Sequence, residues 1–144
     1  DDKFKFEQNK LYSRKDVGLI CLPKTGRPKG GMWDTGYVKV GNNLIIFMNI
    51  GVPGRTEHDF NNSVNERSKT ITWYGKPNSH SFQPTFVKLL SGELTPYFFA
   101  RWDSNNVNFK FPYRGKKNNI SLSLSLYIGH INLTYLCQES NPIQ

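Results

Sequence analysis

Cysteine, histidine and long apolar runs are scarce in this sequence. Its 144 residues include two cysteines and three histidines with no C-x-x-C pair, so neither a disulfide scaffold nor a structural zinc site is expected. The longest apolar run, residues 44–48, is far shorter than the roughly 20 residues of a membrane-spanning helix. This predicts no membrane contact, and the acidic opening of the chain predicts no secretory signal. Because Cys21 and Cys137 are expected to be buried and unpaired, we expect a reducing, cytoplasmic location.

Motifs of the common enzyme classes are also missing. The sequence has no Walker loop and no G-x-G-x-x-G, and its only D-x-K match is Asp1-Asp2-Lys3. His58, His80 and His130 are scattered and show no metal-ligand spacing. We therefore expect no catalytic residue, no metal site and no cofactor, and predict that the domain is not an enzyme by itself.

Acidic residues are outnumbered by basic ones. Lys and Arg total 19 against 11 Asp and Glu, which gives a net charge of +8. Such a surplus attracts polyanions and speeds their capture, so nucleic acid is the expected partner, with a plain lysine-rich surface as the alternative. Two basic, glycine-containing segments, 24–31 and 114–117, are expected to be exposed loops that approach phosphate. The predicted phosphate-binding residues are Arg14, Lys24, Arg27, Lys29, Lys76, Arg101, Arg114, Lys116 and Lys117.

Residue patterns predict one domain over residues 11–144, preceded by an arm or linker over residues 1–10. Short helices are expected at 14–20 after the cap Ser13, at 57–67, and from Ser81 to Gly92 with Pro84 in the first turn. Strands are expected at 37–40, 44–50, 69–74, 97–102, 107–113, 120–127 and 131–137. The predicted fold is α+β, mostly β, with a curved antiparallel sheet or half-open barrel and two or three short helices.

Aromatic residues make up 14% of the chain, and several stand at the junctions of strands and polar loops. Rings in such places are suited to hold an extruded base by stacking, while a nearby Asp or Asn reads its exocyclic amine. The predicted base-pocket residues are Trp33, Asp34, Trp73, Tyr74, Asn78, Trp102 and Asp103.

Several short motifs follow one another between residues 11 and 115. They are Tyr12-Ser13-Arg14-Lys15-Asp16-Val17, Gly30-Gly31 before Thr35-Gly36-Tyr37, Ile71-Thr72-Trp73 before Asn78-Ser79, Phe98-Phe99-Ala100-Arg101, Phe109-Lys110-Phe111 and Tyr113-Arg114-Gly115. This succession resembles the target-recognition, DNA-binding domain of restriction helicases and nucleases, including modification-dependent ones.

The resemblance implies a double-stranded DNA recognition module of a restriction system. In that family the nuclease and motor lie elsewhere in the parent chain, so nuclease or helicase domains of a parent protein are expected partners. Some members act on cytosine-methylated DNA, which makes a modified cytosine, read by base flipping, the favoured target. By analogy the fold would be SRA-like (SET-and-RING-associated) or B3-like.

Three other functions stay open from the residues. The chain could read an unmodified sequence in the major groove through Arg and Asn side chains. It could be a small Mg²⁺-dependent nuclease built on His80 and nearby acids. It could also bind RNA. Methylation dependence, metal-dependent cleavage and a preference for single strands separate these hypotheses.

Overall fold

The computed structural model describes residues 4–30, 33, 36–50, 63–65, 67, 70–74, 84–103, 105–111, 114–124 and 131–138, which form nine strands and two α-helices. The helices are α1 (Arg14–Cys21) and α2 (Pro84–Ser91). The strands are β1 (Leu11–Ser13), β2 (Tyr37–Val40), β3 (Asn43–Asn49), β4 (Ser63–Asn65), β5 (Thr70–Tyr74), β6 (Thr95–Arg101), β7 (Asn108–Lys110), β8 (Arg114–Leu124) and β9 (Ile131–Gln138). The predicted class, a mostly β domain with short helices, is confirmed.

The nine described strands belong to one mixed sheet that branches at β6. One edge of β6 pairs in parallel with β3 along the whole length of both strands. The other edge pairs antiparallel with β8 at Tyr97 and with β7 at Ala100. One branch continues from β7 to β1, the other from β8 through β9 and β5 to β4, and β2 lies outside β3. Because this order has free ends, the described strands do not close into a barrel.

The parallel pairing of β3 with β6 corrects the expected antiparallel sheet. Parallel neighbours need a long crossover connection, whereas antiparallel ones can be joined by a tight turn. Between β3 and β6 the chain passes through β4, β5 and α2, which provides that crossover. Local alternation of side chains does not reveal strand direction, so the sequence pattern missed this feature.

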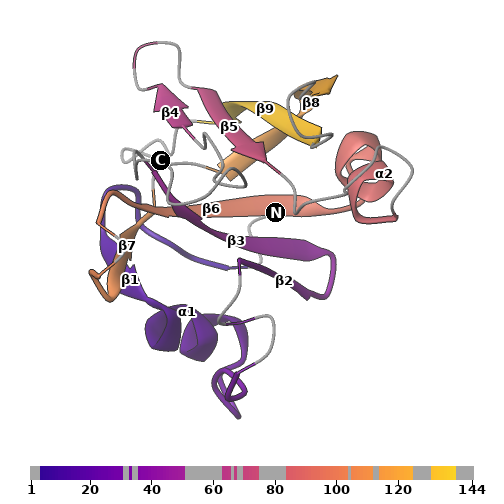
Figure 1. Cartoon of the computed structure of the whole chain (residues 1–144). Helices are drawn as coiled ribbons and strands as arrows, with labels where there is room; N and C mark the ends of the chain where they lie inside the picture. The colour runs from indigo at the N-terminus through magenta and orange to yellow at the C-terminus, as the bar shows by residue number, and fades with distance from the viewer. Residues whose placement is uncertain are drawn as a thin grey trace.

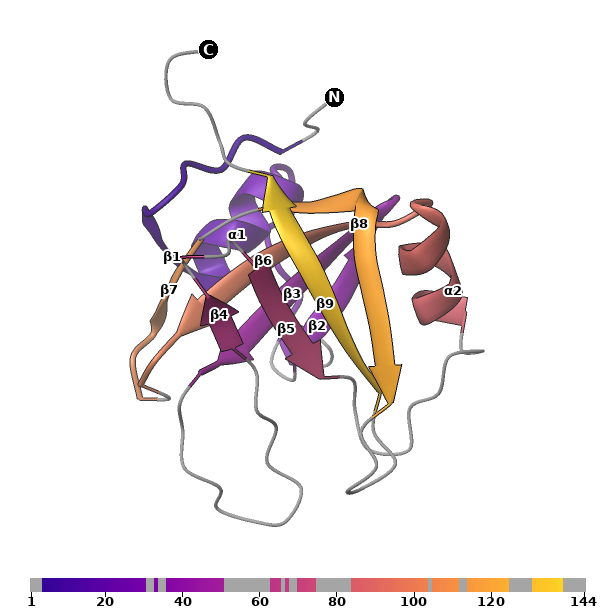
Figure 2. The ribbon, with the colours of Figure 1, turned by 90° about the horizontal axis from the view of Figure 1, so that it is seen from above.

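Side chains of β3 and β6 build a core on each face of the sheet. Residues at alternate positions of β3 point to opposite faces, and both sets are apolar because layers cover the two faces. Figure 1 shows α1 on one side of β3 and β6 and the strands β4, β5, β8 and β9 on the other, and Figure 2 shows the second layer from above. The aromatic core contains Phe4, Tyr12, Val17, Cys21, Trp33, Ile45, Phe47, Tyr97, Phe99, Phe109 and Phe111. The aliphatic core contains Leu44, Ile46, Met48, Ile50, Ile71, Trp73, Leu89, Leu94, Phe98 and Ala100.

Helix α1 begins where the sequence predicts, and α2 lies within the range expected for the later helix. The Ser13 hydroxyl accepts a hydrogen bond from the Asp16 backbone N–H at 3.1 Å, and the Asp16 carboxylate accepts one from the Ser13 N–H at 3.0 Å. This reciprocal pair satisfies two of the donors that a helix start leaves without partners. Pro84 is the first residue of α2, and Gly92, with φ of 82°, follows its last residue. The expected cap Ser81 lies outside the described residues.

Three segments differ from their predicted conformations. Residues 63–65, expected to be helical, form β4, because Val64 pairs with Ile71 and packs on the aliphatic core. Residues 4–10, expected to form an arm, pack on the aromatic core, where Phe4 is buried. The segment from 114, expected to be a basic loop, begins β8 and pairs with the end of β9, with a register shift between Gly115 and Ile120.

Candidate nucleic-acid interface

The three tryptophans, all of them described, lie in three different environments. Trp33 is only 4% exposed in the aromatic core, with its ring 6.4 Å from that of Phe47. Trp73 is 5% exposed in the aliphatic core and packs edge-on against Tyr37 at 5.4 Å. The two cores occupy opposite faces of β3 and β6, so Trp33 and Trp73 do not line one pocket. Burying an indole removes a large apolar area from water, which explains their core positions.

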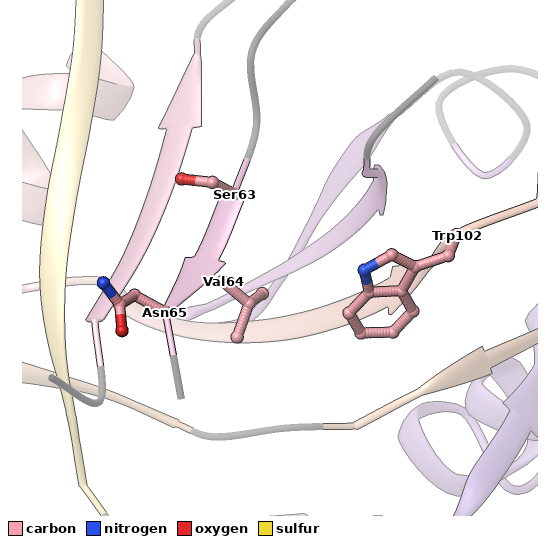
Figure 3. Close-up of a pocket in the computed structure, with 4 residues that line it drawn as sticks. All are labelled: Ser63, Val64, Asn65 and Trp102. Carbon is pink, nitrogen blue, oxygen red and sulfur yellow. The ribbon is translucent and has the colours of Figure 1, made fainter. Parts of the chain in front are cut away.

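Among the predicted pocket rings whose side chains are described, Trp102 is the one that reaches solvent. It follows the last residue of β6 and is 51% exposed. Its ring borders a hollow of about 600 Å³ that is also lined by Ser63, Val64 and Asn65 of β4 (Figure 3). Small-molecule sites in proteins span roughly 300–1,000 Å³, so this hollow is large enough for a planar ring.

Two polar residues of β4 also line this hollow, with their side chains on the side of the strand away from Trp102 (Figure 3). Ser63 is exposed and brings a hydroxyl that can both donate and accept. The Asn65 side-chain oxygen accepts a hydrogen bond from the Arg67 backbone N–H at 3.0 Å, which orients the amide. Val64 adds an apolar wall between them (Figure 3). One aromatic face, one apolar wall and a few hydrogen-bonding groups suit a heteroaromatic ligand. The sequence missed Ser63 and Asn65 because it predicted a helix there.

Arg101 fixes the chain next to Trp102. Its guanidinium carbon lies 4.5 Å from the centre of the Phe109 ring, and it donates to the Asn49 side-chain oxygen and to the Asn106 carbonyl, each at 2.6 Å. Burial lowers the pKa of Arg101, and the nearby Asp103 carboxylate opposes that shift. Arg101 was predicted to bind phosphate. In the structure its guanidinium connects β3, the β6–β7 connection and the Phe109 ring.

Asp103 and Asn106 shape the connection between β6 and β7. The exposed Asp103 carboxylate accepts a hydrogen bond from the Asn105 backbone N–H at 2.9 Å. The Asp103 carbonyl accepts one from the Asn106 N–H at 3.0 Å, and the Asn106 side-chain oxygen accepts one from the Asn108 N–H at 3.0 Å. Asp103, which was predicted to line the base pocket, thus shapes this turn and is not among the described residues that line the hollow.

Among the predicted phosphate-binding residues, Lys24 and Lys29 are exposed. Arg27 is half-buried, because its segment passes so close to α1 that a Cβ atom at Gly18 would lie 2.6 Å from the Arg27 Cβ. The guanidinium carbon of Arg14 lies 5.0 Å from the Phe47 ring centre and 4.9 Å from that of Phe109. The positively charged Arg14 guanidinium therefore packs against two rings of the aromatic core.

Further lysines lie near Arg14, and the sequence patterns did not single them out. Strand β1, which no local signal predicted, pairs with β7 and matches Leu11 with Lys110. This pairing brings the exposed Lys10 and Lys15 to the same end of the sheet as the half-buried Lys110. We call Lys10, Arg14, Lys15 and Lys110 the basic margin. Its members belong to β7 or to the chain in and around β1 and α1, which lie next to one another (Figure 1).

Several predicted site residues lie outside the described part of the chain. They are Asp34, Lys76 and Asn78, together with the side chains of Tyr74, Arg114, Lys116 and Lys117.

The described residues contain neither a metal-ligand cluster nor a membrane-spanning helix. No three His, Cys, Asp or Glu side chains among these residues gather as a metal site would need. None of the described helices has the length and apolar character needed to cross a membrane. Comparison with known protein families, with curated proteins and with solved structures finds no match to this chain.

Proposed function

We propose that this chain is a recognition module for double-stranded DNA that takes one base into the hollow beside Trp102. The observation that carries the proposal is the half-exposed indole over a hollow with polar groups, in a chain of net charge +8. A buried indole contributes to the core, but an exposed one beside a hollow leaves a stacking face open to a ligand. Base–aromatic stacking contributes roughly 1–3 kcal/mol per base and needs only a π-face.

A modified cytosine is the base that this proposal favours. Its ring would stack on Trp102, and a substituent at C5 would pack against Val64. The cytosine amino group needs an acceptor, which the exposed Asp103 carboxylate, on the residue that follows Trp102, can supply. Motif resemblance further supports an origin in a restriction system, with nuclease or helicase domains in a parent protein, and an SRA-like or B3-like fold.

Phosphate contacts would come from the basic margin and from the exposed Lys24 and Lys29. Such contacts set affinity and register but carry no sequence information. Changing both Lys15 and Lys110 to glutamine should therefore weaken all duplexes alike. It should also flatten the slope of log affinity against log salt by about 1–2, because each neutralised phosphate releases condensed counterions.

Fluorescence anisotropy with labelled duplexes over a range of salt concentrations tests this expectation. The matched control is Lys88→Gln on α2, at the opposite end of the sheet from β7 (Figure 1). An equal loss in the control would place the interface elsewhere. If the wild-type chain failed to bind duplex DNA even at low salt, the proposed function would be wrong.

A further inference from the structure

Two exposed apolar side chains, Trp102 and Val107, stand at the two ends of the connection between β6 and β7, and Leu11 on β1 is exposed as well. Val107 is 71% exposed, the largest fraction for any large hydrophobic residue in the described part of the chain, and Leu11 and Trp102 are 55% and 51% exposed. Single exposed hydrophobic residues are ordinary on protein surfaces, but a local group of them marks a contact surface. The connection that carries Trp102 and Val107 projects from one end of the sheet (Figure 2).

The backbone at Val107 is fixed by hydrogen bonds of the neighbouring residues, while the Val107 side chain itself is exposed. The Asn108 N–H donates a hydrogen bond to the Asn106 side-chain oxygen, which connects the residues on either side of Val107. The Arg101 guanidinium donates one to the Asn106 carbonyl at 2.6 Å. On the inner side, Phe109 is fully buried and carries the Arg101 guanidinium on its ring. The valine side chain is therefore presented to solvent on a fixed backbone, and a partner could bind it without a large loss of chain entropy.

We propose that the β6–β7 hairpin enters the major groove of duplex DNA and that Val107 packs there against the C5-methyl group of a pyrimidine. This inference rests on the proposed function. The major groove accommodates a two-stranded β-ribbon, and it is the groove in which the methyl group of thymine or 5-methylcytosine stands. Apolar side chains are the usual contacts of that methyl group.

The charges around the hairpin agree with this placement. The basic margin follows β7, with Lys10 and Lys110 at the base of the ribbon and Arg14 and Lys15 nearer to Val107, where phosphates beside a groove would pass. The tip carries an exposed amide, Asn105, which is suited to polar base edges. The carboxylate of Asp103 would be repelled by phosphates but can accept a hydrogen bond from a cytosine amino group. Basic residues near the backbone and apolar or acceptor groups at the tip fit a duplex groove.

Uracil substitution tests the methyl contact. Anisotropy titrations would compare a duplex containing every trinucleotide with the same duplex carrying uracil for every thymine, both without modified cytosine. The wild-type chain should bind the methyl-bearing duplex about fourfold more tightly for each contacted methyl group. Val107→Ser should abolish this preference while duplex binding persists, and Val107→Ile should retain it. The matched control is Val87→Ser on α2, another exposed valine, which should keep the wild-type ratio.

Each other outcome contradicts the inference in a distinct way. If the wild-type chain bound duplexes with salt-dependent affinity but did not distinguish thymine from uracil, the groove contact would be wrong and the proposed function would stand. If Trp102→Ala removed the methyl preference and Val107→Ser did not, the methyl group would be read in the hollow instead. If no duplex bound, both the inference and the proposed function would fall.

Discussion

Changing Phe99 to alanine is expected to cost about 3–5 kcal/mol of unfolding free energy. Phe99 is fully buried at the centre of the aromatic core. Its ring centre lies 4.9 Å from that of Phe6, 5.7 Å from that of Phe47 and 5.1 Å from that of Phe111. Removing the ring leaves a cavity that these rigid neighbours cannot fill, so the loss includes both the transfer of the ring and the empty volume.

Urea unfolding followed by circular dichroism measures this effect. Because a small domain has only about 5–15 kcal/mol of stability, the variant should unfold at a much lower urea concentration. Val87→Ala, at a half-exposed position of α2, is the control and should change stability by no more than about 0.5 kcal/mol. A loss below about 1 kcal/mol for Phe99→Ala would show that the aromatic core is not packed as described.

Changing Trp102 to alanine is expected to weaken binding of the preferred duplex about tenfold while leaving the fold intact. The expected loss follows from the stacking of one base on the indole, about 1–3 kcal/mol, with tenfold corresponding to about 1.4 kcal/mol. Stability should change little, because half of the side chain already lies in water. Competition anisotropy gives the affinity, and urea unfolding of the same variant gives the stability.

Two control variants separate stacking from a general loss of apolar surface. Trp102→Phe keeps an aromatic face and should recover most of the affinity, whereas Leu19→Ala on α1 removes a similarly exposed side chain away from the hollow. Wild-type affinity in Trp102→Ala, or an equal loss in Leu19→Ala, would contradict a stacking role for Trp102. Fluorescence adds a direct signal, because Trp33 and Trp73 are buried and Trp102 is the tryptophan whose emission a stacked base can reach.

Local signals in the sequence located much of the fold. The capping box at Ser13 and the proline and glycine around α2 fixed helix ends, because those residues act on the backbone beside them. The short strands β1 and β4 were missed, since each has three residues and is defined by a partner distant in sequence. The parallel contact of β3 with β6 was missed for the same physical reason: it depends on where a crossover returns the chain.

The candidate site was predicted less completely than the fold. Trp102 and Asp103 were singled out because they follow an aromatic strand; the Trp102 ring borders the hollow, and Asp103 is exposed on the next residue. Trp33 and Trp73 also flank loops in the sequence, but both are buried. Their burial depends on which distant segments pack against each ring, and local sequence does not reveal this. Ser63 and Asn65 reach the hollow through the pairing of β4 with β5, which no local pattern indicates.

The most direct test of DNA recognition is a binding titration of the wild-type chain at near-physiological salt. One duplex would be presented in unmodified, 5-methylcytosine, 5-hydroxymethylcytosine and N6-methyladenine forms, with a single-stranded competitor. We expect one modified-cytosine duplex to bind at least about tenfold more tightly than the unmodified duplex, because only the preferred base would fill the hollow beside Trp102. Equal, weak and salt-sensitive binding to every form would contradict base recognition and leave only electrostatic attraction to the basic surface.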